Sequence, residues 1–427
     1  MTNVFRNGNF RLVFFGALVS EIGALLYSFA VGFYILEITD NNAFLQGLYL
    51  ALCGAVFLNV TPIGGVLGDR FNKGKIMFVC DYIKGGLIHS ATLAMFIFKE
   101  NAAHVAILFT VGIIGNAVSG IFSPASGALF PHIIEQEQLQ QANSYFSVKN
   151  ALQSILGVVL AGVLYASMPI LVLFVIVGIC YVLSGVSEMF IRYEHHRPEE
   201  RLTVKLALSD MRDGRVYVKS QKPIMVLLVA ILFINFFFTP VASNFIPYFV
   251  KTDVAGAPSY LFDSFLTPEL YSSVLSMMFG ISTLVCSMIL SAKKQDDKCG
   301  KKVAWFLTAT AATLILETVG YYILVERGVS LNAFLILLCG GFLLIGTFIT
   351  FVNIPLNTTL MRITDKDKLS KVTSITGIIA QGMIPIASVL AGTVLQYLGS
   401  SVLLLMSSVG FTAASLFLLF NKETKKF

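Results

Sequence analysis

Charged residues are scarce in this chain of 427 residues. Asp, Glu, Lys and Arg make up 13% of it and apolar side chains make up 56%, whereas an average soluble domain holds about 25% charged residues. A soluble protein with so few charges could not cover its own surface. The composition therefore excludes a disordered chain, a nucleic-acid-binding module and an ordinary soluble enzyme.

The sequence also lacks the short motifs of metal and nucleotide chemistry. Its six cysteines form no Cys-x-x-Cys pair, and five of them lie inside apolar runs, where cysteine behaves as a small hydrophobe. There is no HExxH, no GxSxG and no GxxxxGK[ST] motif. We therefore expect no metal, no cofactor, no enzymatic activity and no ATP-driven pumping.

Long apolar runs are what the chain has in abundance. The hydrocarbon core of a membrane is about 30 Å thick and takes about 20 helical residues to cross, roughly twice the length of a barrel strand. The sequence predicts an all-α integral membrane protein with twelve transmembrane helices, which span 10–36, 44–65, 76–98, 104–123, 146–167, 169–191, 223–250, 270–291, 303–325, 331–355, 374–397 and 400–420.

The basic residues indicate the orientation of these spans. With the N-terminus in the cytoplasm, 26 of the 30 Lys and Arg residues fall in the tails and loops of that side, and Lys149 is counted among them. Cytoplasmic loops carry such an excess. We therefore expect both termini of this multi-pass protein in the cytoplasm, in the cell membrane (plasma or inner) of a bacterium. The net charge of +6 is then a signal of topology and does not indicate nucleic acid.

A long loop and a repeat divide the chain into halves. We expect residues 1–191 to form an N-terminal six-helix bundle, 192–222 a cytoplasmic central loop and 223–427 a C-terminal six-helix bundle. The segment 123–144 is similar to 354–374, so the halves are expected to be related by a pseudo-two-fold axis. Such halves typically hold a substrate site between them near the midplane.

One loop carries a resemblance to a known family. The segment GGVLGDRFNKGKIM (64–77) resembles the signature loop of the major facilitator superfamily. The segments NFRLVFFGALVSEIG (9–23) and FSPASGALFP (122–131) resemble its macrolide-efflux and siderophore-exporter branch of drug:proton antiporters. The resemblance covers nearly the whole chain, and it implies the major facilitator fold and rocker-switch alternating access.

The resemblance also implies a gate on the cytoplasmic side. The family's motif ties the second helix to the eleventh, and here its members are Gly65, Asp69, Arg70, Lys73 and Lys75. Asp69 is expected in the turn between two helices, where it could accept backbone N–H bonds at a helix N-terminus. The alternative is an ordinary tight loop whose charges serve topology alone.

The same resemblance implies that the first, fourth, seventh and tenth helices line a central cavity. Polar side chains follow helical spacing in all four, although small residues also favour helix packing. The cavity candidates are Ser28, Asn116, Ser119, Asn235, Thr239, Asn353 and Asn357.

Glu21 is the most distinctive intramembrane residue. It lies 11 residues past Phe10, which is roughly 16 Å into a layer of about 30 Å. A carboxylate at that depth faces a cavity or a partner, and burial disfavours its charged form. We expect Glu21 to couple proton movement to transport or to pair with cationic cargo. The alternative is a structural, hydrogen-bonded glutamate.

Other ionisable residues are expected to have structural roles. Asp81 and Lys84 are three residues apart and should pair on one helix face. His89 and Glu317 are expected to be packing residues, and Glu188, near a helix end, is expected to reach the interface.

These observations predict a secondary active transporter. It would use a gradient of protons or another cation to export amphipathic small molecules that are drug- or macrolide-like. We expect it to be a monomer that contacts membrane lipids and binds no nucleic acid. The assigned cavity faces carry no basic residue, which favours neutral or cationic cargo. The alternatives are a carrier of the same fold for a siderophore, lysolipid or nutrient, including by uptake, and a membrane sensor that transports nothing.

Overall fold

The protein is built from helices. The computed structural model describes residues 4–134, 142, 145–146, 149–150, 152–192, 218–291, 299–364, 372, 376–377 and 381–426, and these ranges contain no β-strand. The chain divides into two compact units, residues 1–40 with 52–207 and residues 41–51 with 208–427.

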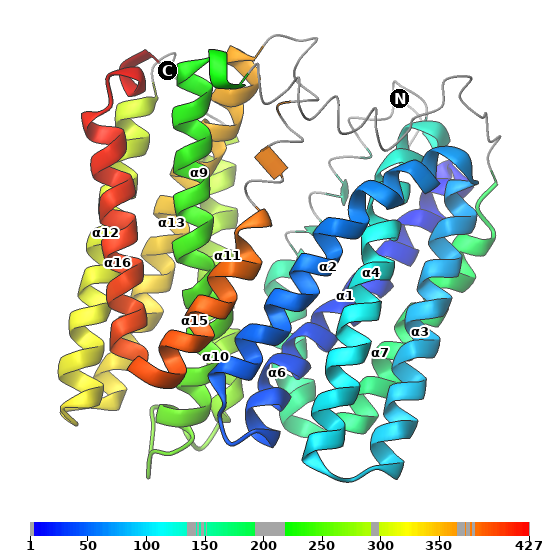
Figure 1. Cartoon of the computed structure of the whole chain (residues 1–427), viewed down its shortest axis with the longest axis horizontal. Coiled ribbons are helices and arrows are strands. Elements are labelled where there is room, and N and C mark those ends of the chain that lie inside the picture. The colour runs from blue at the N-terminus through cyan, green and yellow to red at the C-terminus, as the bar shows by residue number, and fades with distance from the viewer. Residues whose placement is uncertain are drawn as a thin grey trace. The chain divides into compact units, whose positions relative to one another are not determined.

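The helices of the first half alternate in direction through the first unit (Figure 1). Helix α3 packs against both α4 and α7, and α7 also packs against α1. The helices are α1 (Gly8–Ile38), α2 (Ala43–Arg70, whose first turns group with the second unit), α3 (Lys73–Ile97), α4 (Asn101–Ile133), α6 (Val158–Ser167, after a π-helical turn at Gln153–Gly157) and α7 (Ile170–Met189).

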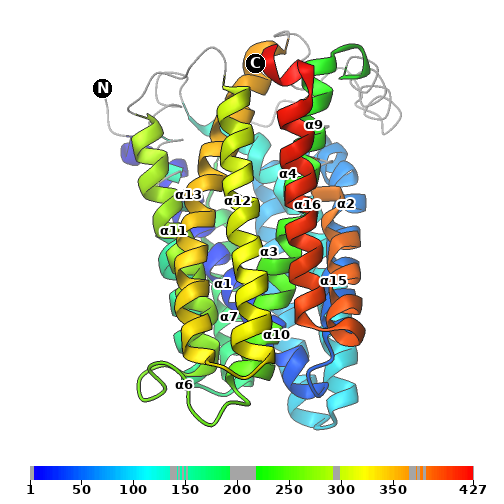
Figure 2. The same ribbon diagram turned by 90° about the vertical axis from the view of Figure 1, so that its left-hand side faces the viewer.

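The second half repeats this packing. Helix α12 packs against α13 and α16 (Figure 2), as α3 packs against α4 and α7. The helices are α9 (Lys222–Pro240), α10 (Ile246–Phe249), α11 (Pro268–Ser291), α12 (Gly300–Gly320), α13 (Leu331–Ile363), α15 (Ile384–Leu398) and α16 (Ser400–Phe420). π-Helical turns at Val241–Phe245 and Val250–Val254 continue α9 through α10, and another at Tyr321–Glu326 extends α12.

These helical segments overlap all twelve predicted stretches, of which 146–167 and 374–397 fall partly outside the described residues, and the predicted all-α membrane fold is confirmed. Nine helices of the described chain are long and apolar enough to cross a membrane. Helix α3 is long enough at 25 residues but less apolar, because it carries the charged Asp81 and Lys84. Helices α6 and α15 are shorter apolar helices within the described residues.

Helices α4 and α13 run furthest beyond their predicted ends. Helix α4 ends at Ile133, beyond Ser123, and α13 ends at Ile363, beyond Pro355. The predicted stretches 104–123 and 331–355 end beside or at a proline, a residue that removes a backbone hydrogen bond and clashes with the preceding turn. Helices in membranes tolerate proline, because neighbouring groups satisfy the carbonyl that it frees.

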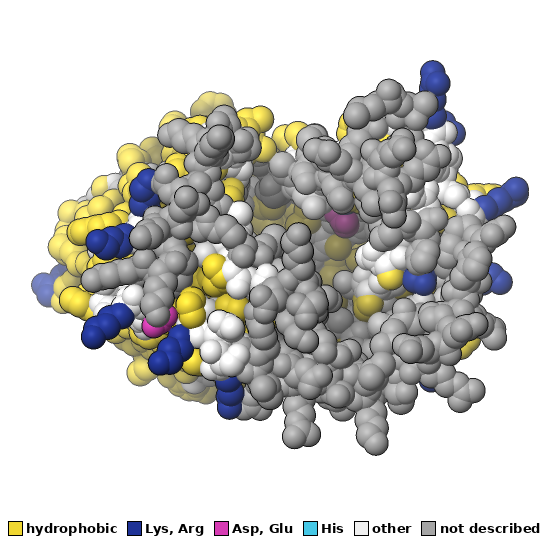
Figure 3. Space-filling view, turned by 90° about the horizontal axis from the view of Figure 1, so that it is seen from above, with side chains coloured by type: hydrophobic (Ala, Val, Ile, Leu, Met, Phe, Trp, Pro, Cys, Tyr) yellow, Lys and Arg dark blue, Asp and Glu magenta, His cyan; other side chains and the backbone are white. Residues whose placement is uncertain are grey.

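The surface combines basic helix ends with apolar flanks. Large apolar side chains such as Leu93, Phe96 and Trp305 are more than half exposed, as expected for helices that face lipid. Basic side chains stand on the face seen in Figure 3. The exposed ones at helix ends include Arg6, Arg11, Arg70 and Lys75 in the first unit and Lys219, Lys222, Lys301 and Lys302 in the second.

Glycines allow the closest helix contacts. Gly64 on α2 lies against the backbone of Gly120 and Ile121 on α4, and a Cβ added to Gly64 would stand 2.6 Å from Ile121 Cα. Within the second unit, Gly47 and Gly392 meet in the same way, with a Cβ on Gly47 3.0 Å from Gly392 Cα. Small residues at such contacts allow van der Waals packing of membrane helices.

We expect Gly64→Ala to destabilise the protein by about 1–3 kcal/mol, because the added methyl group meets backbone atoms that cannot move aside. Gly65→Ala is the matched control, since a Cβ there meets nothing within 4 Å. Thermal unfolding of the purified chain in detergent measures both variants. Equal unfolding midpoints for the two would contradict the close α2–α4 packing.

Candidate functional site

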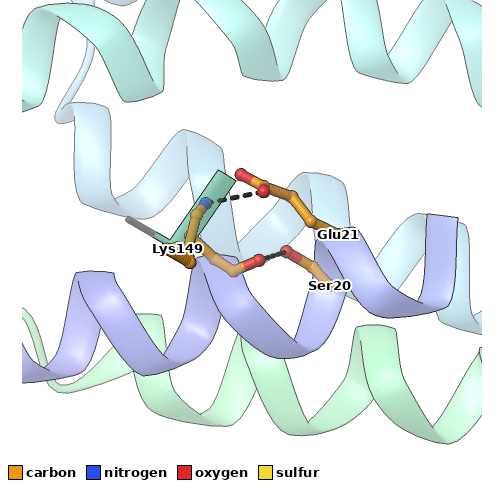
Figure 4. A network of polar contacts seen from close by, with 4 residues as sticks. Ser20, Glu21 and Lys149 are labelled. Carbon is orange, nitrogen blue, oxygen red and sulfur yellow. Dashed lines mark hydrogen bonds and ion pairs between the residues drawn. The ribbon is translucent and has the colours of Figure 1, made fainter. Parts of the chain in front are cut away.

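Glu21 lies near the middle of α1 and forms an ion pair with Lys149. Lys149 Nζ stands 2.6 Å from Glu21 Oε2, and the two side chains point toward each other in Figure 4. The neighbouring Ser20 hydroxyl donates to the carbonyl of Ala17 at 3.4 Å and so stays on its own helix. The Lys149 side chain is 2% exposed and that of Glu21 is 44% exposed. The ammonium is therefore buried, whereas the carboxylate can be approached.

The location of Lys149 corrects the sequence analysis. The count of basic residues by loop places Lys149 among the cytoplasmic lysines, but it is helical and buried. Lys149 lies on none of the four helices assigned to the cavity, but it brings a basic group to the Glu21 carboxylate on α1. The signal was present in the sequence, because Lys149 falls inside the predicted apolar stretch 146–167, where an ammonium group requires a partner.

An aromatic ring lies beside the lysine and is part of a cluster of rings. Its Nζ lies 5.0 Å from the centroid of the Phe146 ring, a distance at which a ring face attracts a cation. Phe146 packs edge-on against Phe10 at 6.1 Å and Phe14 at 5.5 Å, both on α1. Low polarity around a close ion pair strengthens the attraction between its charges. The ion pair therefore has an enclosed ammonium and a half-exposed carboxylate.

The other cavity candidates lie apart from this pair. In the first unit, Ser28 is exposed, and Asn116 and Ser119 are half-buried. The Asn116 side-chain amide donates to the Gly112 carbonyl at 2.8 Å, on its own helix. Among the described residues no hydrogen bond or ion pair joins any of these three side chains to Glu21.

The second unit shows the same pattern. Asn235 and Thr239 on α9 are half-buried, and Asn353 and Asn357 on α13 are exposed. Asn235 donates to the Ile231 carbonyl at 2.9 Å, and Asn357 donates to the Asn353 carbonyl at 3.0 Å. An amide bonded in this way keeps its own oxygen and a second N–H for other partners. These side chains could therefore still contact a ligand.

The structure corrects the position of Asp69. Helix α2 continues to Arg70, so Asp69 lies in its last turn and not at a helix N-terminus. Asn72 caps α3 instead, because its side-chain oxygen accepts the Lys75 backbone N–H at 3.1 Å, as asparagine commonly does at this position. The side chain of Asp69 lies outside the described residues.

The remaining members of the signature differ in burial. Lys73 is buried at the start of α3, whereas Arg70 and Lys75 are exposed and Gly65 is half-buried. The glycine leaves open space, since a Cβ there would meet nothing within 4 Å.

Three further ionisable residues are buried. Asp81 and Lys84 pair as predicted, with 3.7 Å between Oδ1 and Nζ. The expectation that Glu188 reaches the interface is wrong, because it is 1% exposed. Gly16 on α1 leaves room for it, and a Cβ added there would stand 3.4 Å from Glu188 Cγ. Glu317 on α12 is fully buried against Gly341 of α13.

His89 has the packing role that the sequence suggested. Its Nδ1 lies 2.7 Å from the Gly85 carbonyl of its own helix, and its ring covers Gly178 of α7.

Comparisons with known sequences point to one family. The family model described as Major Facilitator Superfamily matches residues 13–388. The chain is 25% identical over 331 residues to the "Uncharacterized MFS-type transporter YkuC" of Bacillus subtilis (strain 168), covering 75% of this chain and 72% of that protein. It is 23% identical over 288 residues to Macrolide efflux protein A of Streptococcus pyogenes, covering 66% and 67%.

Solved structures share the fold at low sequence identity. The nucleoside transporter NupG superposes with a TM-score of 0.75 at 10% identity, over 97% of this chain and all of that one. A D-xylose-proton symporter superposes with a TM-score of 0.68 at 14% identity, over the full length of both chains. At these identities the likeness shows the fold alone.

Removing either partner of the Glu21–Lys149 pair should have unequal effects on stability. Glu21→Gln leaves a buried ammonium without its anion and should cost about 3 kcal/mol. Lys149→Met should cost less, because the half-exposed carboxylate can be hydrated or take up a proton. In the double variant most of the loss should be recovered.

Thermal unfolding midpoints of the purified chain in detergent provide the measurement. A larger loss for Lys149→Met than for Glu21→Gln would contradict the burial of the ammonium.

Proposed function

The chain belongs to the major facilitator superfamily, and we propose that this multi-pass membrane transporter exports amphipathic small molecules in exchange for protons. The proposed cargo is drug- or macrolide-like. The 23% identity to Macrolide efflux protein A supports export, and the fold shared with a D-xylose-proton symporter is consistent with proton coupling. We infer transport and not catalysis as the activity.

The Glu21–Lys149 ion pair is the observation that carries this proposal. Lys149 is enclosed, but Glu21 can be approached, so a proton or a cationic group of the cargo can replace the ammonium as its partner. Because one carboxylate cannot satisfy a proton and a cationic group at once, binding of one favours release of the other. Mutual exclusion of this kind is what exchange of cargo for protons requires.

Polar side chains of both halves complete the proposed site. Ser28, Asn116 and Ser119 would contact cargo from the N-terminal bundle (1–191). Their counterparts in the C-terminal bundle (223–427) would be Asn235, Thr239, Asn353 and Asn357. Amides that use one N–H within their own helix can contact different cargos, which suits a transporter with broad specificity.

The signature loop would provide the gate. We assign Gly65, Asp69, Arg70, Lys73 and Lys75 to a cytoplasmic latch that closes and opens as the two bundles rock. Arginine presents a rigid fork of donors to carbonyl or carboxylate oxygens, so such a latch can hold one state and still break. Both termini would lie on that side of the cell membrane.

A second cargo class is favoured by Lys149. Once Glu21 is protonated, the enclosed ammonium would lack its anion, and an anionic group of the cargo, such as a carboxylate or phosphate, could take that place by entering past the half-exposed Glu21 side chain. This would fit the alternative of a carrier for a siderophore, lysolipid or nutrient.

We expect Glu21→Gln to reduce transport driven by a pH gradient to the rate of protein-free vesicles, because an amide cannot carry the proton. Macrolide flux into proteoliposomes that hold the purified chain is the measurement, with the gradient applied in either direction. Glu37→Gln is the matched control. Glu37 lies on the same helix and bonds the Tyr165 hydroxyl at 3.0 Å, outside the ion pair. Unchanged gradient-driven flux in Glu21→Gln would refute proton coupling at this residue.

Lys149→Met separates the two cargo classes. If cargo is neutral or cationic, this variant should still bind it, because the carboxylate remains. If cargo is anionic, binding should be lost along with the ammonium. Equilibrium binding of a macrolide and of a carboxylate-bearing siderophore to the purified variant distinguishes these results, and loss of macrolide binding would contradict the proposed export of drug-like cargo.

A further inference from the structure

A second group of ionisable side chains lies inside the first unit, between α3 and α7. Helix α3 contributes Asp81 and Lys84, and α7 contributes Ser184 and Glu188. Their exposures are 0% for Asp81 and Ser184, 1% for Glu188 and 8% for Lys84. No part of the function proposed above uses these residues.

Lys84 is held between one carboxylate and two rings. Its Nζ lies 3.7 Å from Asp81 Oδ1, 4.6 Å from the centroid of Phe122 and 5.2 Å from that of Tyr181. The distance to Asp81 suits an ion pair but is too long for a hydrogen bond. The ammonium is thus attracted to Asp81 without being bonded to it.

The carboxyl oxygens of Glu188 are buried and have no hydrogen-bond partner in the described structure. Those of Asp81 have Lys84 and the Ser184 hydroxyl beside them. Buried polar groups in proteins are nearly always bonded, so such a group calls for a specific explanation. Glu188 is the sharpest case, because the α1 residue against it is Gly16, which has no side chain to offer.

The titratable groups near Glu188 come from all the helices packed around it. Asp81 and Lys84 of α3 act on it directly, and Cys80 lies within electrostatic reach on the same helix. Tyr181 of α7 faces Asp81, and Tyr27 of α1 faces Tyr181. Among the described residues that act on this cluster, Lys84 is the single cation.

The charges of this cluster do not balance. Two carboxylates and one ammonium would leave one negative charge in apolar surroundings, at a cost of several kcal/mol. In practice a buried group neutralises itself instead. Since Lys84 pairs with Asp81, the carboxyl without a partner is that of Glu188.

We propose that Asp81, Lys84 and Glu188 form a proton-binding site within the first unit, separate from Glu21. Glu188 holds the proton while Lys84 pairs with Asp81. When the proton leaves for water, the negative charge on Glu188 draws Lys84 toward α7, and the contact between α3 and α7 changes with pH.

The ligand is a proton and not a metal ion. The part of the chain that the structure describes has no group of three or more His, Cys, Asp or Glu side chains that could hold a metal, and Lys84 would repel one. Glu188 is the next-to-last residue of α7. Arg192, just beyond it, is exposed, and its backbone N–H donates to the Asn9 side-chain oxygen at 3.0 Å. Protons would therefore reach the site from this end of α7.

Infrared difference spectroscopy of the full chain in lipid tests the site directly, because a protonated carboxyl has a carbonyl stretch that a carboxylate lacks. We expect Glu188→Gln to remove one such band that titrates in the parent protein. Glu21→Gln should keep this band, because it lies outside the cluster. Glu317→Gln is the matched control for a buried glutamate that has no cation near it, and it should also keep the band.

Lys84→Met gives an independent measurement if Glu188→Gln fails to fold. Without the ammonium, both Asp81 and Glu188 must be neutral. The infrared band of protonated carboxyl groups should therefore gain the intensity of one carboxyl group. An unchanged band in Glu188→Gln, or no gain in Lys84→Met, would overturn the proposal. The spectra need neither cargo nor a gradient, so failure of the transport tests would leave this result intact, and the reverse also holds.

Discussion

A buried ammonium group needs an anion beside it, and this requirement organises the proposed centre of the first unit. Lys149 is almost fully enclosed, and Glu21 lies 2.6 Å from its Nζ. The Phe146 ring lies beside the ammonium and packs against Phe10 and Phe14 of α1. The chain has few charges. If the Glu21–Lys149 ion pair separates, Glu21 can bind a proton or cargo, and this would couple a proton gradient to transport.

In apolar surroundings, each of the remaining ionisable side chains needs a partner or must be neutral. Helices satisfy their backbone groups internally, which leaves side chains as the polar groups that need partners. Asp81, Lys84 and Glu188 form a cluster of two carboxyl groups and one ammonium group. Glu317 is instead packed against Gly341. We infer that the first unit holds two ionisable sites, an accessible one at Glu21 and an enclosed one at Glu188.

Much of the fold follows from the sequence, because crossing a lipid layer imposes a length and a composition on each helix. The twelve apolar stretches and the Asp81–Lys84 pair could be predicted in this way. Lys149 was missed because basic residues near helix ends were counted by loop, and Glu188 because a residue near a helix end was expected to reach water. The cap at Asn72 was assigned to Asp69, since the end of α2 depends on tertiary contacts that periodicity does not show.

The central claim is that a proton and cargo compete for Glu21. Its most direct test is to add a cationic macrolide to the purified protein in weakly buffered solution and to follow the pH. The account predicts proton release on binding by the parent protein and none by Glu21→Gln at the same occupancy. Equal release from both proteins would contradict it.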